Sequence, residues 1–187
     1  MFLLVGLGND QNNLLDSRHN IGFRVIDQLI NHYNINTLKQ KFHSYIAKGL
    51  LDNKKVILIK PKTMMNLSGF PVSEVVNFYK VSLDNIIVFH DDLDISLGEI
   101  KIKIGGGNAG HNGLKNIDSL IGKDYMRIRI GIGHPGSKDL VSNYVLGNFT
   151  KKENYVITSL IQNISKNINF ILDRKKDVFL SKIRILN

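Results

Sequence analysis

The 187-residue chain contains no cysteine, only three prolines and fewer acidic than basic residues. The absence of cysteine excludes disulfide bonds, thiolate metal sites and cysteine nucleophiles. No segment of the sequence approaches the length of a membrane span. The opening residues, MFLLVGLGND, lack a basic region and a small-residue cleavage site, so we expect a buried strand there rather than a signal peptide. These features favour a cytoplasmic enzyme or nucleic-acid-binding protein.

Basic residues outnumber acidic ones by 25 to 16, which gives a formal net charge of +9. Such a balance favours a polyanionic partner, either nucleic acid or a membrane surface, because it steers association and releases counterions. A surface of solvated lysines explains the charge equally well. Hydrophobic content of 43% is ordinary for a globular protein.

Apolar runs and periodic patterns predict strands that alternate with helices. We expect strands at 2–7, 43–51, 55–59, 85–89, 99–104 and 127–132, with a turn at Asp52-Asn53. We expect helices at 20–34, 67–79, 112–121 and 151–172, and a last short helix after Arg174. No repeat, low-complexity tract or Pro/Ser linker divides the chain. The pattern predicts a single domain over residues 1–187, an α/β three-layer sandwich with a twisted, mixed but largely parallel sheet flanked by helices.

Five glycines lie within the nine residues GGGNAGHNG, from Gly105 to Gly113. The segment contains G-x-G-x-x-G, but a dinucleotide-binding fingerprint follows the first strand of its unit and has an acidic partner about twenty residues on. This loop follows a late strand and lacks that partner. His111 stands where a phosphate-binding loop would have lysine. We therefore expect no nucleotide cofactor.

Polar side chains with catalytic potential follow several predicted strands. In an open α/β sheet, ligands bind outside the carboxyl ends of the strands. Histidine can take a proton from water near neutral pH, a carboxylate can fix its tautomer, and asparagine amides can donate to an oxyanion. No G-x-S-x-G is present, so direct attack by water is preferred to an acyl-enzyme. The segments concerned are 17–20, 60–66, 90–91 and 111–112.

Structural interpretations stay open for several of these residues. His19 could cap a helix, and His90 and His111 could be structural histidines, an interpretation we prefer for His90. Asp92 and Asp94 are typical of turns and caps. A metal site from the HDDLD run with His19 is chemically possible, although the run lacks dedicated ligand spacing.

Two basic pairs alternate along predicted strands. Lys101 and Lys103 point to one face of their strand, and Arg127 and Arg129 do so in another. A solvated sheet face explains either pair. Their position beside the candidate loops favours a phosphate-bearing substrate.

Taken together, the motifs resemble those of bacterial peptidyl-tRNA hydrolases. They span about three quarters of the chain in the family's order: VGLGN (5–9), SRHNIGF (17–23), KPKTMMNLSG (60–69), HDDLD (90–94), GGGNAGHNGLK (105–115) and RIRIGIGHPG (127–136). The resemblance implies cleavage of the ester that joins a peptide to the 3′-terminal ribose of tRNA, releasing free tRNA during translation. It also implies a monomer without a cofactor or metal. A non-catalytic RNA-binding protein and a metal-dependent hydrolase remain the alternatives.

The same resemblance assigns catalytic roles. It makes His19 the base that activates water and Asp91 the group that holds His19. It places Asn9 against the peptide, and it places Asn66 and Asn112 near the scissile carbonyl, for the oxyanion or the water.

It also assigns tRNA contacts. Lys103 and Arg129 match positions associated with the tRNA 5′-phosphate, and Lys101 and Arg127 are weaker candidates. Several substrate-facing positions depart from the family pattern: Asp10-Gln11 replaces Pro-Gly, Leu14 an aromatic residue, Met64 a phenylalanine and Ala109 a glycine. We expect these departures to affect substrate affinity before the hydrolytic step.

Overall fold

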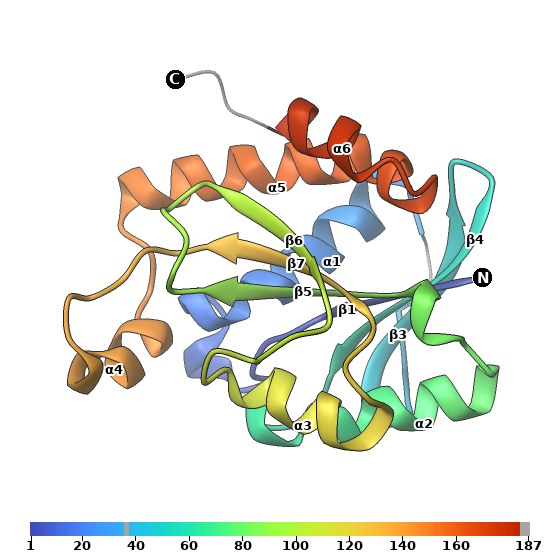
Figure 1. Cartoon of the computed structure of the whole chain (residues 1–187), viewed down its shortest axis with the longest axis horizontal. Helices are drawn as coiled ribbons and strands as arrows, with labels where there is room; N and C mark the ends of the chain where they lie inside the picture. Colours follow the sequence, from blue (N-terminus) through green and yellow to red (C-terminus); the bar gives the residue numbers. More distant parts are fainter. Residues whose placement is uncertain (36–37, 184–187) are drawn as a thin grey trace.

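One sheet runs through the middle of the molecule, with helices on both faces (Figure 1). The computed structural model of the chain describes residues 1–35 and 38–183. Within these ranges the sheet has seven strands in the order β2-β3-β4-β1-β5-β7-β6. They are β1 (Phe2–Gly6), β2 (Lys39–Lys41), β3 (Ser44–Leu51), β4 (Lys54–Pro61), β5 (Ile86–Asp92), β6 (Ile100–Ile104) and β7 (Met126–Gly131).

The helices form two layers. One face of the sheet carries α1 (Ile21–His32), α5 (Lys151–Leu172) and α6 (Lys176–Ile183), and the other carries α2 (Gly69–Tyr79) and α3 (Asn112–Ile121) (Figure 1). The short α4 (Val141–Leu146) stands apart, at one end of the sheet. Single turns of 3-10 helix join these elements, including η1 (Asn12–Leu14), η2 (Arg18–Asn20) and η3 (Met65–Leu67). No helix of the described ranges is long and apolar enough to cross a membrane.

The four central strands, β4, β1, β5 and β7, run parallel to one another. Alternate residues of these strands enter two separate cores, because successive side chains point to opposite faces. Leu4 and Ile87 pack toward α1 and α5, whereas Leu3 and Val88 pack toward α2 and α3. Burial on both faces explains why these strands read as continuous apolar runs. Their carboxyl ends meet at one edge of the sheet.

The predicted succession of strands and helices is confirmed, and α5 has the predicted bounds. Asp52 and Asn53 form a two-residue hairpin turn with φ of 44° and 66°. The sequence analysis missed β2 and α4. β2 has the sequence KQK, with no apolar residue, and α4 is a six-residue helix with no buried side chain. The last predicted helix is α6, and residues 184–187 lie outside the described part.

The glycine loop leads from β6 into α3. β6 pairs antiparallel with β7 at the edge of the sheet, so the loop does not belong to a parallel βαβ unit. Gly105, Gly106 and Gly110 have φ of 66°, 83° and 80°, which only glycine adopts without strain. Ala109 shares this left-handed conformation at φ 48°. The glycines therefore shape the loop.

Candidate active site

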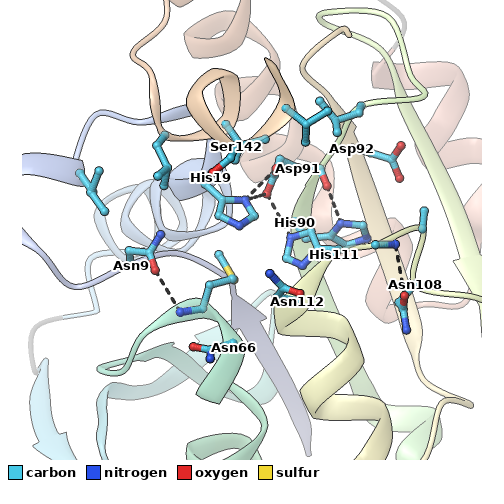
Figure 2. Close-up of a pocket in the computed structure, with 18 of the residues that line it drawn as sticks. Asn9, His19, Asn66, His90, Asp91, Asp92, Asn108, His111, Asn112 and Ser142 are labelled. Atoms are coloured by element: carbon cyan, nitrogen blue, oxygen red, sulfur yellow. Dashed lines mark hydrogen bonds and ion pairs between the residues drawn. The ribbon is translucent and has the colours of Figure 1, made fainter. Parts of the chain in front are cut away.

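A cleft of about 900 Å³ opens at the carboxyl ends of the parallel strands (Figure 2). Loops that follow β1, β4 and β7 line it, together with the end of β5 and the start of α3. Of the nine predicted site residues, Lys103 and Arg129 lie outside the cleft. The other seven line it: Asn9, Leu14, His19, Met64, Asn66, Asp91 and Asn112.

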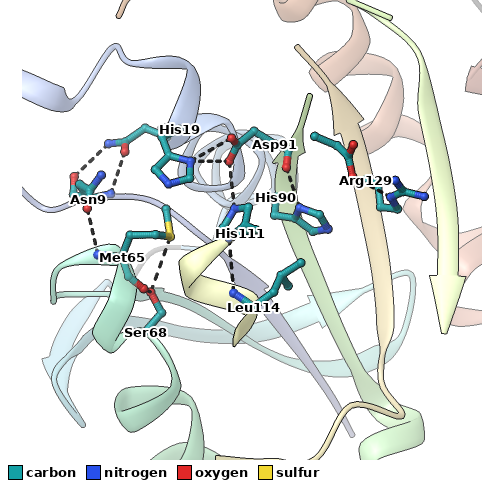
Figure 3. A network of polar contacts seen from close by, with 11 residues as sticks. Asn9, His19, Met65, Ser68, His90, Asp91, His111, Leu114 and Arg129 are labelled. Atoms are coloured by element: carbon teal, nitrogen blue, oxygen red, sulfur yellow. Dashed lines mark hydrogen bonds and ion pairs between the residues drawn. The ribbon is translucent and has the colours of Figure 1, made fainter. Parts of the chain in front are cut away.

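His19 and Asp91 form the predicted pair. His19 lies in η2, just before α1, and Asp91 is the second-last residue of β5. The Nδ1 atom of His19 is 2.8 Å from Oδ1 and 2.9 Å from Oδ2 of Asp91 (Figure 3). Because a carboxylate only accepts hydrogen bonds, Nδ1 carries the proton. The Nε2 atom is thereby the basic nitrogen of the ring.

His111 is a second histidine on the same carboxylate, and the sequence analysis left open whether it is a structural histidine or part of the site. Its Nε2 is 3.1 Å from Oδ1 of Asp91, and its Nδ1 accepts a hydrogen bond from the backbone N–H of Leu114 at 3.4 Å (Figure 3). Both ring nitrogens are thus engaged, so His111 supports Asp91 rather than offering a base. His111 is the N-cap of α3. A polar residue just before a predicted helix is a sequence signal that could have indicated this capping position.

Burial and neighbouring charges shift the pKa values of His19, Asp91 and His90. Burial lowers the pKa of His19, but the charge of Asp91 and its hydrogen bond outweigh this, so the pKa is raised above 6.5. Burial raises the pKa of Asp91, and the two imidazoles that contact it bring this pKa well below its usual range. His90 is fully buried, and its burial together with the neighbouring His111 lowers its pKa to about 3. Asp91 is therefore a carboxylate, and His90 is neutral.

Asn9 is fixed by two neighbours. Its backbone N–H donates to Oδ1 of Asn20 at 2.7 Å, and the Asn20 amide donates back to the carbonyl of Asn9 at 3.0 Å. The Oδ1 atom of Asn9 accepts the backbone N–H of Met65 at 3.0 Å. Among residues 1–35 and 38–183, no acceptor lies within hydrogen-bond distance of the Asn9 side-chain NH2 group, which leaves it for a ligand in the cleft. Asn20 is a supporting residue that sequence reasoning did not single out.

Asn66 and Asn112 lie at the starts of two helical segments. Asn66 belongs to η3, and Asn112 is the first residue of α3. Both side chains are exposed and line the cleft (Figure 2). Two amides and a helix N-terminus are thus available to stabilise negative charge.

Arg18 joins the histidine segment to the far wall of the cleft. Its guanidinium is 2.9 Å from Glu153 and 2.6 Å from the carbonyl of Asn148, and it lies 4.3 Å from the Tyr144 ring centroid. Tyr144 belongs to α4, whose neighbouring residues line the cleft. The side chain of Arg18 is 9% exposed. Sequence reasoning found no role for Arg18, because its partners lie more than 120 residues away.

The basic residues of β6 and β7 differ in burial and in their ion pairs. Arg127 is 1% exposed, binds Asp118 at 2.7 Å and donates to the carbonyl of Gly107 at 3.0 Å. The suggestion that Arg127 contacts phosphate is therefore wrong, because the guanidinium is committed to a buried ion pair. Arg129 binds Asp92 at 2.7 Å and keeps 22% of its side chain exposed, and Lys103 is exposed.

Asp92 also accepts the backbone N–H of Asp94 at 3.0 Å, as expected for a turn residue. The unusual Asp10 accepts a hydrogen bond from the hydroxyl of Tyr45 at 3.3 Å. Its carboxylate therefore has a partner on β3.

The fold and the cleft together define an enzyme of the hydrolase class. A family model described as Peptidyl-tRNA hydrolase matches residues 3–185, so the chain belongs to the peptidyl-tRNA hydrolase family.

Known proteins agree with this assignment. The peptidyl-tRNA hydrolase of Bartonella henselae is 46% identical over 183 residues, covering 98% of this chain and 95% of that protein. That of Wolbachia pipientis is 45% identical, covering 98% of this chain and all of the relative. A crystal structure of peptidyl-tRNA hydrolase from Acinetobacter baumannii superposes with a TM-score of 0.92 at 38% identity, covering 98% of this chain and 94% of the other. The mixed, largely parallel sheet is thus the fold of this family.

Proposed function

We propose that His19 is the general base with which this chain hydrolyses the ester bond of peptidyl-tRNA. The observation that carries the proposal is the contact of 2.8 Å between His19 Nδ1 and Asp91. It fixes the tautomer that leaves Nε2 as the base, in a ring that lines the cleft.

The reaction then needs no covalent intermediate. His19 Nε2 takes a proton from water as the water oxygen bonds to the ester carbonyl carbon. The bond from that carbon to the ribose oxygen breaks, and the imidazolium returns the proton to the ribose oxygen. Asp91 stabilises the imidazolium while it exists. His111 holds Asp91 from the other side. The products are free tRNA and the peptide acid, which releases a proton to solvent and becomes a carboxylate.

The asparagines orient the substrate around this base. We assign Asn66 and Asn112 to the oxyanion or the water, because both amides reach the cleft from helix starts. We assign the amide of Asn9 to the peptide side, where its fixed orientation favours an acceptor such as a blocked amino group. Leu14 and Met64 supply apolar walls.

Lys103 and Arg129 lie outside the cleft and are proposed to bind a tRNA phosphate. They share one face of the sheet, since their strands pair with Lys101 opposite Arg129 and Lys103 opposite Arg127. Because these two cations lie outside the cleft, contacts from them to phosphate would orient the tRNA without taking part in ester hydrolysis.

A metal-dependent mechanism is the second candidate, because His19, Asp91 and His111 place ligand atoms within 4.8 Å of one another. His19 Nδ1 and His111 Nε2 already form hydrogen bonds to Asp91. A metal ion bound to these nitrogens would replace both hydrogen bonds and take away the contact that orients His19 as a base. Chelation by EDTA separates the two mechanisms.

The whole chain, residues 1–187, is proposed to fold as one domain and to act as a monomer in the cytoplasm, since one copy supplies every residue assigned above. Incubation with N-acetyl-aminoacyl-tRNA tests the function directly: release of free tRNA by the wild type, and its loss in His19→Ala, are expected. Retained turnover in that variant would reject His19 as the base.

A further inference from the structure

An exposed apolar stripe leaves the cleft along η3 and α2. Buried and exposed residues alternate there with a helical period: Met65, Ser68 and Gly69 face inward, whereas Met64, Leu67 and Phe70 face solvent. These three outward side chains are 53%, 47% and 48% exposed. Residues three apart are neighbours on a helical surface, so they form one track. Met64 lines the cleft and is therefore the beginning of the track.

The track continues farther along α2. Phe70, Glu74 and Phe78 follow at four-residue spacing on one face of the helix, and Phe78 is 58% exposed. The turn between β2 and β3 packs on this face. His43 lies 5.0 Å from the Phe70 ring and 2.8 Å from Glu74, and Phe42 lies 4.9 Å from the Phe78 ring.

That turn is backbone-strained. Phe42 and His43 have φ of 54° and 47°, a conformation that suits Asn, Asp or Gly at a two-residue hairpin. The other hairpin of the chain uses Asp52 and Asn53 at the same positions. Aromatic residues here cost about 1 kcal/mol each, which their packing against α2 must offset. The turn thus keeps Phe42 and His43 in a strained backbone conformation in which both rings pack against α2.

We propose that this surface binds apolar residues of the peptide moiety upstream of the ester. We call it the α2 track, and it consists of Met64 at the cleft, Leu67, Phe70 and Phe78 along the helix, and Phe42 and His43 from the turn. The proposal rests on the proposed function, and it extends the substrate beyond the residue attached to tRNA. From Leu67 to Phe78 a helix rises about 16 Å, which matches about five residues of extended peptide.

The position of the track favours peptide over RNA. The sheet order places β2 and β6 at opposite edges, so the track lies across the molecule from Lys103 and its neighbours (Figure 1). A substrate that is tRNA at one end and peptide at the other fits this separation.

The rings themselves also favour peptide. Nucleic-acid bases need open aromatic faces for stacking. The Lys41 ammonium lies 4.6 Å from the ring centroids of both Phe42 and Phe78, and these two rings are tilted by 50° to each other. Aliphatic Leu67 offers no stacking face. Apolar side chains of a peptide have no such requirement.

The test compares three substrates built on one tRNA: an N-acetyl-aminoacyl ester, a peptide with six apolar residues upstream, and a peptide of equal length with glycine and serine upstream. The variant is Leu67→Gln/Phe70→Ser. Tyr155→Ser is the matched control, because Tyr155 is 79% exposed on α5, on the other face of the sheet. Thermal melting checks that each variant folds.

We expect kcat/KM of the double variant to fall about fivefold to tenfold on the apolar peptide, the size expected when two half-exposed side chains lose a ligand contact. It should stay unchanged on the N-acetyl-aminoacyl ester, and the control should match the wild type on all three substrates. An equal loss on all three, or no loss on the apolar peptide, would overturn the proposal. So would weaker competitive inhibition by deacylated tRNA, which would make the track an RNA surface. Failure of the wild type on the N-acetyl-aminoacyl ester would instead overturn the proposed function.

Discussion

Two carboxylates near α3, those of Asp91 and Asp118, accept hydrogen bonds from different kinds of side chain. Asp91 receives the imidazoles of His19 and His111, whereas Asp118 receives the guanidinium of Arg127 and the hydroxyl of Tyr125, each at 2.7 Å. Arginine stays charged at any accessible pH, but histidine changes charge near neutrality. Only the Asp91 cluster can therefore exchange a proton during a reaction. It opens into the cleft, and the Asp118 cluster ties the glycine loop to α3.

The largest effect on activity is expected from a change at His19, in the Asp91 cluster. His19→Ala removes the proposed base, and kcat/KM on N-acetyl-aminoacyl-tRNA is expected to fall about a thousandfold. The fold and tRNA binding should persist, because His19 lies at the cleft and contributes little to either core. Thermal melting and a filter-binding assay provide the controls. Turnover within tenfold of the wild type would mean that another group removes the proton.

Asp118→Asn should act on stability instead. The change leaves the Arg127 guanidinium, 1% exposed, without its charged partner, which typically costs about 3 kcal/mol in free energy of unfolding. Urea denaturation measures this loss. The pH dependence of kcat/KM should not move, since Asp118 does not contact His19. A shifted pH profile in this variant would show that the two clusters are coupled.

Lys103→Ala tests whether binding of the tRNA phosphate is separate from the chemistry in the cleft. Because Lys103 is exposed and outside the cleft, its loss should raise KM about fivefold on 5′-phosphorylated tRNA, consistent with removal of one surface phosphate contact. kcat should stay constant, and substrates with a 5′-hydroxyl should show no added loss. Lys166→Ala, an exposed lysine of α5 on the other face of the sheet, is the matched control. Equal effects on both kinds of tRNA would indicate a general charge effect.

The smallest effect is expected from chelation. If Asp91 only orients imidazoles, prolonged dialysis against EDTA should leave kcat/KM unchanged. Loss of activity that Zn²⁺ or another divalent ion restores would favour the metal-dependent mechanism at His19, Asp91 and His111.

Most of the fold was predictable because its central strands are buried on both faces. Leu3 to Val5 and Ile86 to Phe89 are continuous apolar runs, and α5 has a regular apolar stripe with a capping box at Thr150. The missed β2 carries no apolar residue. The six-residue α4 has no buried residue, so its sequence shows no helical pattern of apolar positions. These two elements depend on tertiary contacts that local patterns do not encode.

The site was predictable by residue type and only partly by geometry. Loops at the strand ends indicated that His, Asp and Asn side chains could converge, and the family resemblance singled out His19, Asp91 and the asparagines. All of these residues line the cleft. The alternation along β7 placed Arg127 and Arg129 on one face, but alternation does not distinguish a buried ion pair from an exposed cation. The bond from His111 to Asp91 spans two elements, so only the fold reveals it.

The pH dependence of kcat/KM in the wild type and in Asp91→Asn shows directly whether Asp91 holds His19 as the base. The base must be neutral, so activity is lost as pH falls through the pKa of His19, which lies above 6.5 in the wild type. Without the Asp91 charge, burial alone acts on His19 and lowers this pKa. We expect a lower rate and an acidic limb displaced to lower pH in the variant. An acidic limb at the wild-type position would contradict the pairing.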